Sequence, residues 1–168
     1  SGQMGPRGNK VATRLMKEAD VILALGTRLG FNSTFYSYEN INKKAKIIQV
    51  ELEKKMIGKY FPVSIGILGD AATVATQLLN ALKQKKIFSN SKTWTKKFII
   101  DRKKFLSDRE QIKSKDRPIQ PKALFKELRK VLPKNTAITL DAGTLCLQAT
   151  DSLNYYKPPY LFSPLDFG

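Results

Sequence analysis

The chain has 168 residues, of which 42% are hydrophobic and 26% charged, a composition typical of folded globular proteins rather than disordered ones. Thirty Lys and Arg against 14 Asp and Glu give a formal net charge of +16, and there is no histidine. The sequence therefore excludes Ser–His and Cys–His catalytic pairs and histidine-based zinc motifs. No apolar run approaches the roughly 20 residues that span a bilayer, so we expect no membrane partner. The single cysteine, Cys146, excludes an internal disulfide and favours a cytoplasmic location.

The first predicted elements are a helix and a strand. Apolar residues recur at helical spacing over residues 9–19. The five apolar residues Val21–Leu25 follow, and an apolar run without alternation predicts a strand buried on both faces, as in a parallel sheet covered by helices. The loop after this strand contains Gly26 and Arg28, at the edge where an open α/β sheet holds its ligand. Arg28 has the donors to bind phosphate; the alternative is a solvated arginine at a strand end.

The next section alternates strands with helices, which indicates an α/β fold. Glu51 ends one predicted strand, where an acidic residue in a dinucleotide-binding sheet often meets a ribose hydroxyl; a solvent-facing strand end is the alternative. Asp70 is expected to cap the helix that it precedes. The predicted elements are a loop or short helix over 31–42, strands over 45–52 and 64–68, a helical turn over 56–60, and a helix that follows Asp70 and runs to about residue 83.

Residues 86–117 differ from the rest in charge, with eleven Lys or Arg and four Asp or Glu. Apolar residues recur there at helical spacing, namely Trp94, Phe98, Ile99, Phe105 and Leu106. We expect a linker helix with a docked apolar stripe and a basic face in water; a site for an anionic partner is the alternative. The overall basic charge also suggests nucleic-acid binding as a function, but no helix-turn-helix, zinc-knuckle or aromatic RNA-binding signature supports this function.

The last section begins at Pro118. Pro121 suits the first turn of a helix, and strands are expected over 136–140 and 160–162. Between these strands, a turn that contains Gly143 leads into a helix over 145–153, in which Cys146 is interpreted as a buried hydrophobe rather than a nucleophile. The residues expected on the buried face of the first helix are Leu124, Phe125, Leu128, Val131 and Leu132.

Several motifs, taken in order, carry a resemblance to a known family. They are V-I-L-A-L-G-T-R-L, K-I-I-Q-V-E-L and V-S-I-G-I-L-G-D-A, followed by I-Q-P to L-D-A-G and a final L-D-F-G. Together they resemble the central domain and the start of the C-terminal domain of thiamine-diphosphate-dependent enzymes, in the group of acetolactate synthase, oxalyl-CoA decarboxylase and sulfoacetaldehyde acetyltransferase. The resemblance implies a parallel-sheet, Rossmann-like α/β domain over 1–85, a basic helical linker over 86–117, and the first part of a second α/β domain, which binds the cofactor, over 118–168.

The resemblance also implies cofactor contacts. Gly143 and Thr144 match the turn beside the diphosphate of thiamine, and Leu165 and Phe167 match the segment under its aminopyrimidine ring. Phe167 stands where most relatives place Met, Ile or Leu as the apolar wedge that bends the cofactor. The central-domain positions where relatives hold FAD or ADP are matched by Gly26, Arg28, Glu51, Asp70 and Ala71. The loop after Arg28 departs from the acidic pair usual in FAD-binding acetolactate synthases and reads L-G-F-N-S-T.

The implied function is that of a thiamine-diphosphate lyase or transferase that acts on a 2-oxo acid or related small carbonyl donor and passes on a two-carbon unit. Magnesium would hold the diphosphate, and the complete enzyme would be a homodimer or tetramer. The magnesium motif and the activating glutamate of the family are not found in this chain, so we expect an internal piece that is inactive alone and carries no catalytic or metal-ligating residue. Two alternatives remain: a stand-alone module that binds FAD, ADP or NAD, and a basic nucleic-acid-binding protein whose affinity falls steeply with salt.

Overall fold

The computed structural model describes residues 2–5, 8–87, 92–110, 117–141, 143–153, 156, 161 and 162. The chain divides into two compact units, Met4–Ile99 and Ser1–Gln3 with Ile100–Gly168. The division falls inside the section predicted as a linker; the domain boundaries at 85 and 117 remain predictions. Within the described ranges, no helix combines the length and the apolar character needed to cross a membrane.

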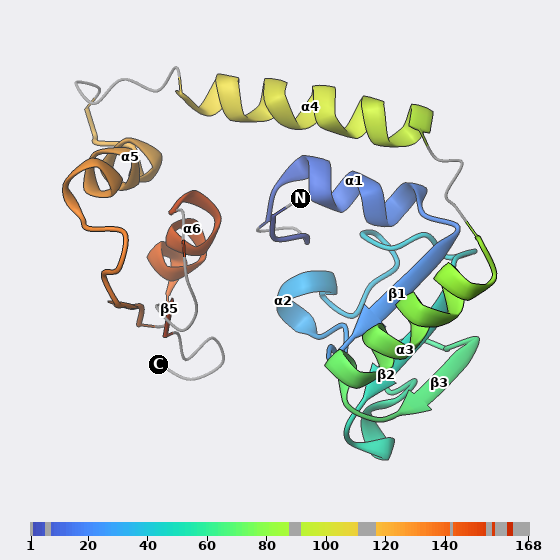
Figure 1. Cartoon of the computed structure of the whole chain (residues 1–168). Helices are drawn as coiled ribbons and strands as arrows, with labels where there is room; N and C mark the ends of the chain where they lie inside the picture. The colour runs from blue at the N-terminus through green and yellow to red at the C-terminus, as the bar shows by residue number, and fades with distance from the viewer. Residues whose placement is uncertain are drawn as a thin grey trace. The chain divides into compact units, whose positions relative to one another are not determined.

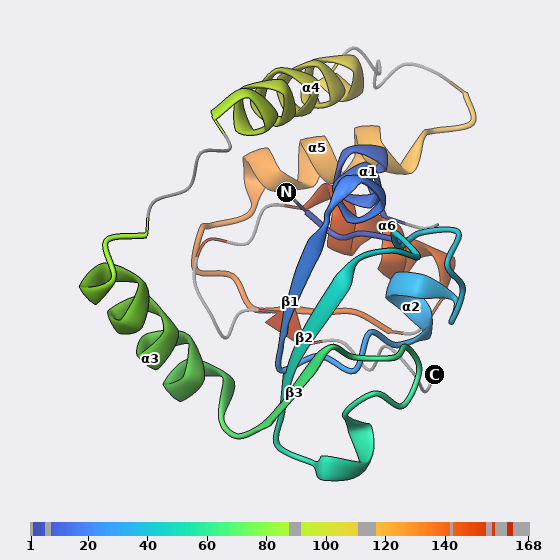
Figure 2. The same cartoon turned by 90° about the vertical axis from the view of Figure 1, so that its right-hand side faces the viewer.

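The first unit is built on a three-stranded parallel sheet in the order β1-β2-β3. Figures 1 and 2 show β2 between its two neighbours. The elements are α1 (Lys10–Glu18), β1 (Val21–Leu25), α2 (Phe31–Thr34), β2 (Lys46–Glu51), the 3₁₀ turn η1 (Lys54–Met56), β3 (Ile65–Leu68) and α3 (Ala71–Gln84). The predicted α/β class with a parallel sheet is confirmed, and the predicted helical turn lies two residues earlier than expected.

Side-chain caps set where α1 begins and how it enters the sheet. Asn9 is buried, and its Oδ1 accepts a 2.7 Å hydrogen bond from the Ala12 amide, which otherwise has no partner in the first turn. Asn42 Nδ2 donates to the carbonyl oxygen of Ala19 at 3.0 Å, just before β1. These two asparagines therefore satisfy backbone groups at both ends of the helix.

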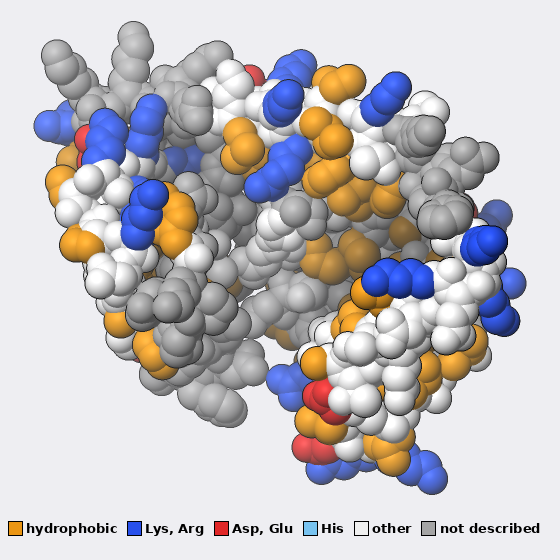
Figure 3. All heavy atoms as spheres, viewed as in Figure 1, with side chains coloured by type: hydrophobic (Ala, Val, Ile, Leu, Met, Phe, Trp, Pro, Cys, Tyr) orange, Lys and Arg blue, Asp and Glu red, His pale blue; other side chains and the backbone are white. Residues whose placement is uncertain are grey.

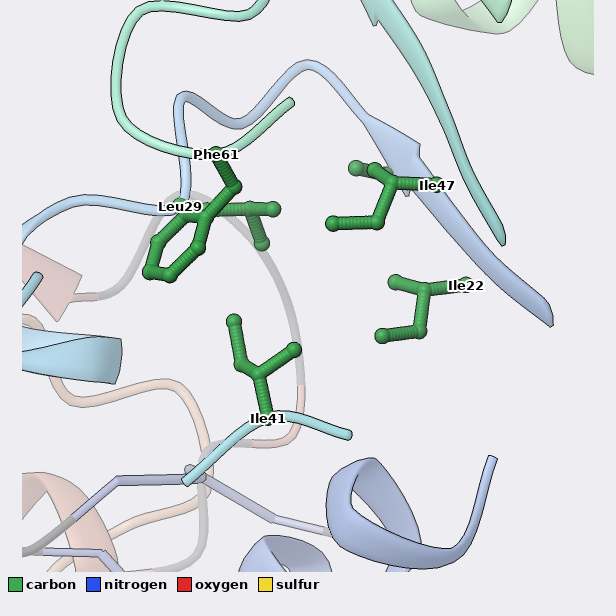
Figure 4. Close-up of a cluster of buried hydrophobic side chains, with 6 residues drawn as sticks. Ile22, Leu29, Ile41, Ile47 and Phe61 are labelled. Atoms are coloured by element: carbon green, nitrogen blue, oxygen red, sulfur yellow. The ribbon is translucent and has the colours of Figure 1, made fainter. Parts of the chain in front are cut away.

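The core of this unit lies on one face of the sheet. Ile22 from β1 and Ile47 from β2 point toward Leu29, Ile41 and Phe61, which come from three connecting segments (Figure 4). All five are at most 6% exposed. The segments that follow the strands are therefore part of the core and not merely attached to it.

The expectation that β1 is buried on both faces is wrong. Its residues alternate, with Ile22 and Ala24 buried, whereas Val21 is 56% exposed and Leu23 and Leu25 are also exposed. The physical reason is that α3, the helix that follows β3, stands apart from the strands (Figure 2) and has no buried residue. An unbroken apolar run allows burial on both faces, but it does not supply the second covering layer.

The second unit has a smaller two-stranded parallel sheet, in which Ile138 lies opposite Leu161. Its core is formed by Phe125, Ala149 and Leu153. The elements are α5 (Pro121–Val131), β4 (Ile138–Thr139), α6 (Thr144–Ser152) and β5 (Leu161–Phe162); α4 (Lys92–Glu110) spans the division between the units.

Two expectations about helix faces need correction. In α5, Phe125 is buried as predicted, but Leu124 is exposed and Val131 is 74% exposed. The helix of the basic section exists as α4. In its expected apolar stripe Trp94, Ile99 and Leu106 are exposed, whereas Phe98 and Phe105 are half-buried, so the stripe is buried only in part. Figure 3 shows basic and hydrophobic side chains next to each other along α4. Helical spacing identifies the element; burial depends on what packs against it.

Gly5 gives a test of the packing under α2. It has φ +98°, and a Cβ atom built there would collide with the backbone oxygens of Asn32 and Ser33. We predict that Gly5→Ala destabilises the protein by about 3 kcal/mol, because it combines backbone strain with a clash against groups that cannot turn away. Gly69→Ala is the control, since its Cβ would meet Val74 at an ordinary 3.4 Å. Urea unfolding followed by circular dichroism measures both; equal midpoints would contradict the prediction.

Candidate nucleotide and cofactor sites

The loop between β1 and α2 begins with Gly26, which continues the sheet. Its amide donates to the Val50 carbonyl at 2.9 Å, and its φ is +59°. A Cβ atom at Gly26 would lie 3.4 Å from the Cβ of Ala71, the first residue of α3. The structure therefore brings together two of the predicted site residues, 45 positions apart in the chain.

The backbone on both sides of Arg28 is held in place. Leu29 is buried in the core although its φ is +53°, a conformation that costs a residue with a side chain of order 1 kcal/mol or more. Its amide donates to Thr27 Oγ1 at 3.2 Å, and its carbonyl accepts from the buried Thr34 Oγ1 at 3.0 Å. Arg28 itself is exposed, and its Nε would lie 3.4 Å from a Cβ atom placed on Gly30. An exposed guanidinium thus stands between two anchored neighbours.

Gln49 is a residue that the sequence reasoning missed. It lies in β2, is 3% exposed, and uses its amide in three hydrogen bonds. Nε2 donates to the carbonyls of Thr27 and Met56, both at 3.2 Å, and Oε1 accepts from the Gly58 amide at 2.9 Å. The available signal was a lone amide side chain between the apolar residues of the run I-I-Q-V, since buried polar groups need partners.

Aromatic side chains gather beside this loop. The rings of Tyr36 and Tyr60 stack with centroids 4.3 Å apart, and those of Phe31 and Phe35 with centroids 4.6 Å apart. A hydrogen bond with Tyr36 lowers the pKa of Tyr60, and the positive charges of Lys59 and Arg28 lower it further. The same hydrogen bond raises the pKa of Tyr36. Arg28 therefore lies close enough to both phenols for its charge to act on them.

Glu51 and Asp70 lie at neighbouring strand ends. The Gly69 amide donates to the Glu51 carbonyl at 3.0 Å, so the turn that carries Asp70 is bonded to the end of β2. Asp70 caps α3 as predicted, because its Oδ1 accepts from the Thr73 amide and hydroxyl, both at 2.8 Å. These bonds lower the pKa of the Asp70 carboxyl. Two carboxylates at this edge suit hydroxyl groups of a ligand better than its phosphates.

In the second unit, Gly143 and Thr144 stand at the start of α6. Gly143 is exposed with φ +147°, and a Cβ atom there would meet nothing within 4 Å. Thr144 opens the helix, whose N-terminus has no side-chain cap hydrogen bond. Leu165 and Phe167 lie outside the described residues. Cys146 is buried, as the sequence predicted.

Known proteins match this chain in two ways: a family model matches most of the first unit, and relatives match nearly the whole chain. Residues 1–78 match the family described as thiamine pyrophosphate enzyme, central domain. The chain is 28% identical to sulfoacetaldehyde acetyltransferase of Castellaniella defragrans, over 99% of the chain and 31% of that protein. It is 30% identical to the enzyme of the same name from Roseovarius nubinhibens, over 100% of the chain and 32% of the relative. The chain thus spans about a third of these curated relatives.

A second group of relatives carries a different name. The chain is 34% identical to a protein of Methanocaldococcus jannaschii named "Probable acetolactate synthase large subunit", over 84% of the chain and 24% of that protein. Both names belong to the group that the sequence motifs resemble.

The cap at Asp70 generates a pH prediction. The lowered pKa of its carboxyl in the folded state means that the ionised cap stabilises the fold above the ordinary value of 3.8. This contribution disappears as the pH falls through the lowered pKa. We predict that Asp70→Asn, which can still accept the bonds from Thr73, removes this part of the acid sensitivity, whereas Asp70→Ala lowers stability at neutral pH as well. Thermal unfolding between pH 2 and pH 7 measures it; identical pH profiles for the wild type and Asp70→Asn would contradict it.

Proposed function

We propose, from the match of residues 1–78 to the central domain of thiamine pyrophosphate enzymes, that the complete protein is a thiamine-diphosphate-dependent transferase or lyase. Its substrate would be a 2-oxo acid or a related small carbonyl compound, from which a two-carbon unit is transferred. The observation that carries the proposal is that relatives named sulfoacetaldehyde acetyltransferase match the whole chain, including residues 79–168 beyond the central-domain match.

The start of α6 fits the diphosphate of the cofactor. The first amides of a helix attract an anion, because they lack backbone partners and the helix dipole adds positive potential. The N-cap residue of α6 is Gly143, which makes no side-chain cap hydrogen bond and places no Cβ atom beside these amides. Thiamine diphosphate, when bound, supplies an electron sink beside the reacting carbonyl. The part of Gly143 and Thr144 in this proposal is to hold and orient the diphosphate.

The remaining features of the proposal follow from the same premise. Magnesium would accompany the diphosphate and neutralise its charge, and we assign it no ligand among residues 1–168. The complete protein would be a homo-oligomer, and the single cysteine fits a cytoplasmic location. Leu165 and Phe167 would lie under the aminopyrimidine ring.

The test uses the full-length protein with thiamine diphosphate and magnesium. We predict transfer of a two-carbon unit as an acetyl group, either from sulfoacetaldehyde to phosphate with release of sulfite, or from pyruvate to a second 2-oxo acid with release of carbon dioxide. We further predict that Gly143→Val weakens thiamine diphosphate binding by at least tenfold, because a branched side chain disfavours φ +147° and the turn that leads into α6 would have to change conformation. Calorimetry measures the affinity. Gln120→Val is the matched control, since Gln120 holds the same position before α5 and also makes no side-chain cap bond. No turnover of either substrate pair, together with no cofactor binding, would overturn the proposal.

A second proposal concerns FAD or ADP at the edge of the first sheet. The observation that favours it is that Gly26, which is exposed at the end of β1, lies beside Ala71 at the start of α3, near the strand end of Glu51. Arg28 would bind phosphate, and Glu51 and Asp70 would accept from hydroxyl groups of the ribose. The same binding, if the complete protein shows no turnover, would instead support a stand-alone nucleotide-binding module.

Neutralising one arginine tests this second proposal. We predict that Arg28→Gln weakens ADP or FAD binding by at least tenfold, because a charge-assisted bond to phosphate is lost. Lys46→Gln is the control: it removes an equal charge from the opposite, amino-terminal end of the sheet. Calorimetry with ADP and with FAD measures both variants. Absence of binding to the wild-type protein, or equal losses in the two variants, would contradict the prediction.

A further inference from the structure

We infer that Gln49 is a positioning residue that joins the loop of Arg28 and the loop of Tyr60 into one preformed anion-binding surface. The inference rests on the proposed binding of a phosphate-bearing ligand at this edge of the sheet. To the predicted site it adds Gln49, which need not touch the ligand, and a second loop over residues 56–60. None of the predicted site residues lies in that loop.

The first step is the geometry of the Gln49 amide. From a buried position in β2 it donates to the carbonyl of Thr27 in one loop and to the carbonyl of Met56 in the other, and it accepts from the Gly58 amide. The three partners are backbone groups, separated from Gln49 by 22, 7 and 9 residues. A single side chain therefore sets the separation of two loops that are not consecutive in the chain.

Each of the two loops presents a positively charged or aromatic side chain close to its bond with Gln49. Thr27 precedes Arg28, whose other neighbour, Leu29, is packed in the core. Gly58, with φ +71°, precedes Lys59 and Tyr60. Both loops are thus bonded to Gln49 within two residues of the positively charged or aromatic side chain that they present.

The side chains that the two loops present lie close to one another. Tyr60 stacks on Tyr36 with centroids 4.3 Å apart, and Lys59 Nζ lies 5.3 Å from the centre of the Tyr60 ring. The charges of Arg28 and Lys59 both act on the Tyr60 phenol. A guanidinium, an ammonium and two phenol groups in one neighbourhood are suited to a phosphate or pyrophosphate group.

The backbone around the aromatic residues indicates that this arrangement is built in. Phe35 and Tyr36 both have φ near +54°, which is unfavourable for residues with large side chains. Such conformations persist only where surrounding contacts enforce them. The Tyr36 amide donates to Thr34 Oγ1 at 3.0 Å, and the same buried hydroxyl bonds to Leu29 and Gly30. The aromatic segment and the Arg28 loop are therefore anchored through one threonine.

The test begins with a readout that needs no ligand. Tyr60 has a lowered pKa because Tyr36 donates a hydrogen bond to it and because Lys59 and Arg28 are near. If Gln49 sets the separation of the loops, its loss should return the ionisation of Tyr60 toward the ordinary pKa of 10.0. Absorbance titration of the phenols, with Tyr60→Phe to assign the signal, measures this shift directly.

Two variants and one control make the experiment specific. Gln49→Met keeps the length of the side chain and removes all three hydrogen bonds without burying a charge. Gln49→Glu keeps the acceptor for Gly58 but turns a carboxylate toward two carbonyl oxygens. Ile47→Val is the control, because it loosens the same strand and core without contacting either loop through a polar group. All are made in the full-length protein, with inorganic pyrophosphate as the probe for binding.

The expected result is an upward shift of the Tyr60 ionisation and at least a tenfold loss of pyrophosphate affinity in both Gln49 variants, with neither change in Ile47→Val. Phenol ionisation at the wild-type pH in a folded Gln49→Met or Gln49→Glu protein overturns the inference, as does an equal shift in the control. If the wild type binds no pyrophosphate, the proposed binding at this edge fails, whereas the phenol titration still decides the role of Gln49. Should one variant fail to fold, the other decides.

Discussion

The candidate site of the first unit depends on a core that is shared between strands and loops. Ile22 and Ile47 come from the sheet, whereas Leu29 and Phe61 come from the segments that follow β1 and η1. Burying these side chains removes apolar surface from water, which is the main favourable term in folding. The loops that carry Arg28 and Tyr60 are therefore held by the same free energy that holds the strands together, and they cannot move far without opening the core. A ligand that bound there would meet groups already placed, and would spend little of its binding energy on ordering them.

Polar contacts then refine what the core has placed. Thr34 and Gln49 are both almost completely buried, and each satisfies backbone groups of more than one segment. These hydrogen bonds fix the relative orientation of the segments more than they add to stability. A buried hydrogen bond contributes only about 1 kcal/mol net, whereas leaving its partner unsatisfied costs more. The strained backbone at Leu29, Phe35 and Tyr36 is tolerated because these contacts and the core leave few alternatives.

The elements that could be predicted from the sequence are those set by local patterns. The apolar runs before Gly26 and Glu51 identified β1 and β2, and the carboxylate of Asp70 identified the start of α3. The family resemblance was confirmed by the match over residues 1–78. What could not be predicted depends on partners distant in the chain: the one-sided burial of β1, the exposure of Val131 and Trp94, and above all the bonds of Gln49. A glutamine among apolar strand residues indicates a buried amide that needs hydrogen-bond partners, but the sequence does not identify the loops that supply them.

In each unit a glycine with positive φ lies beside the start of a helix: Gly26 beside Ala71 of α3, and Gly143 directly before α6. The two helix starts differ in how their first amides are capped. At α3, the Asp70 carboxylate already engages the first-turn amide of Thr73 and adds a negative charge. At α6, Gly143 precedes a helix whose N-terminus has no side-chain cap bond. The charged cap at α3 disfavours a further anion at that helix end, whereas the N-cap residue of α6 adds no charge of its own. It follows that any phosphate bound at the first sheet must be held on the side of Arg28 and Lys59. This is why the separation of their two loops, which Gln49 sets, matters more for that site than the helix beside it.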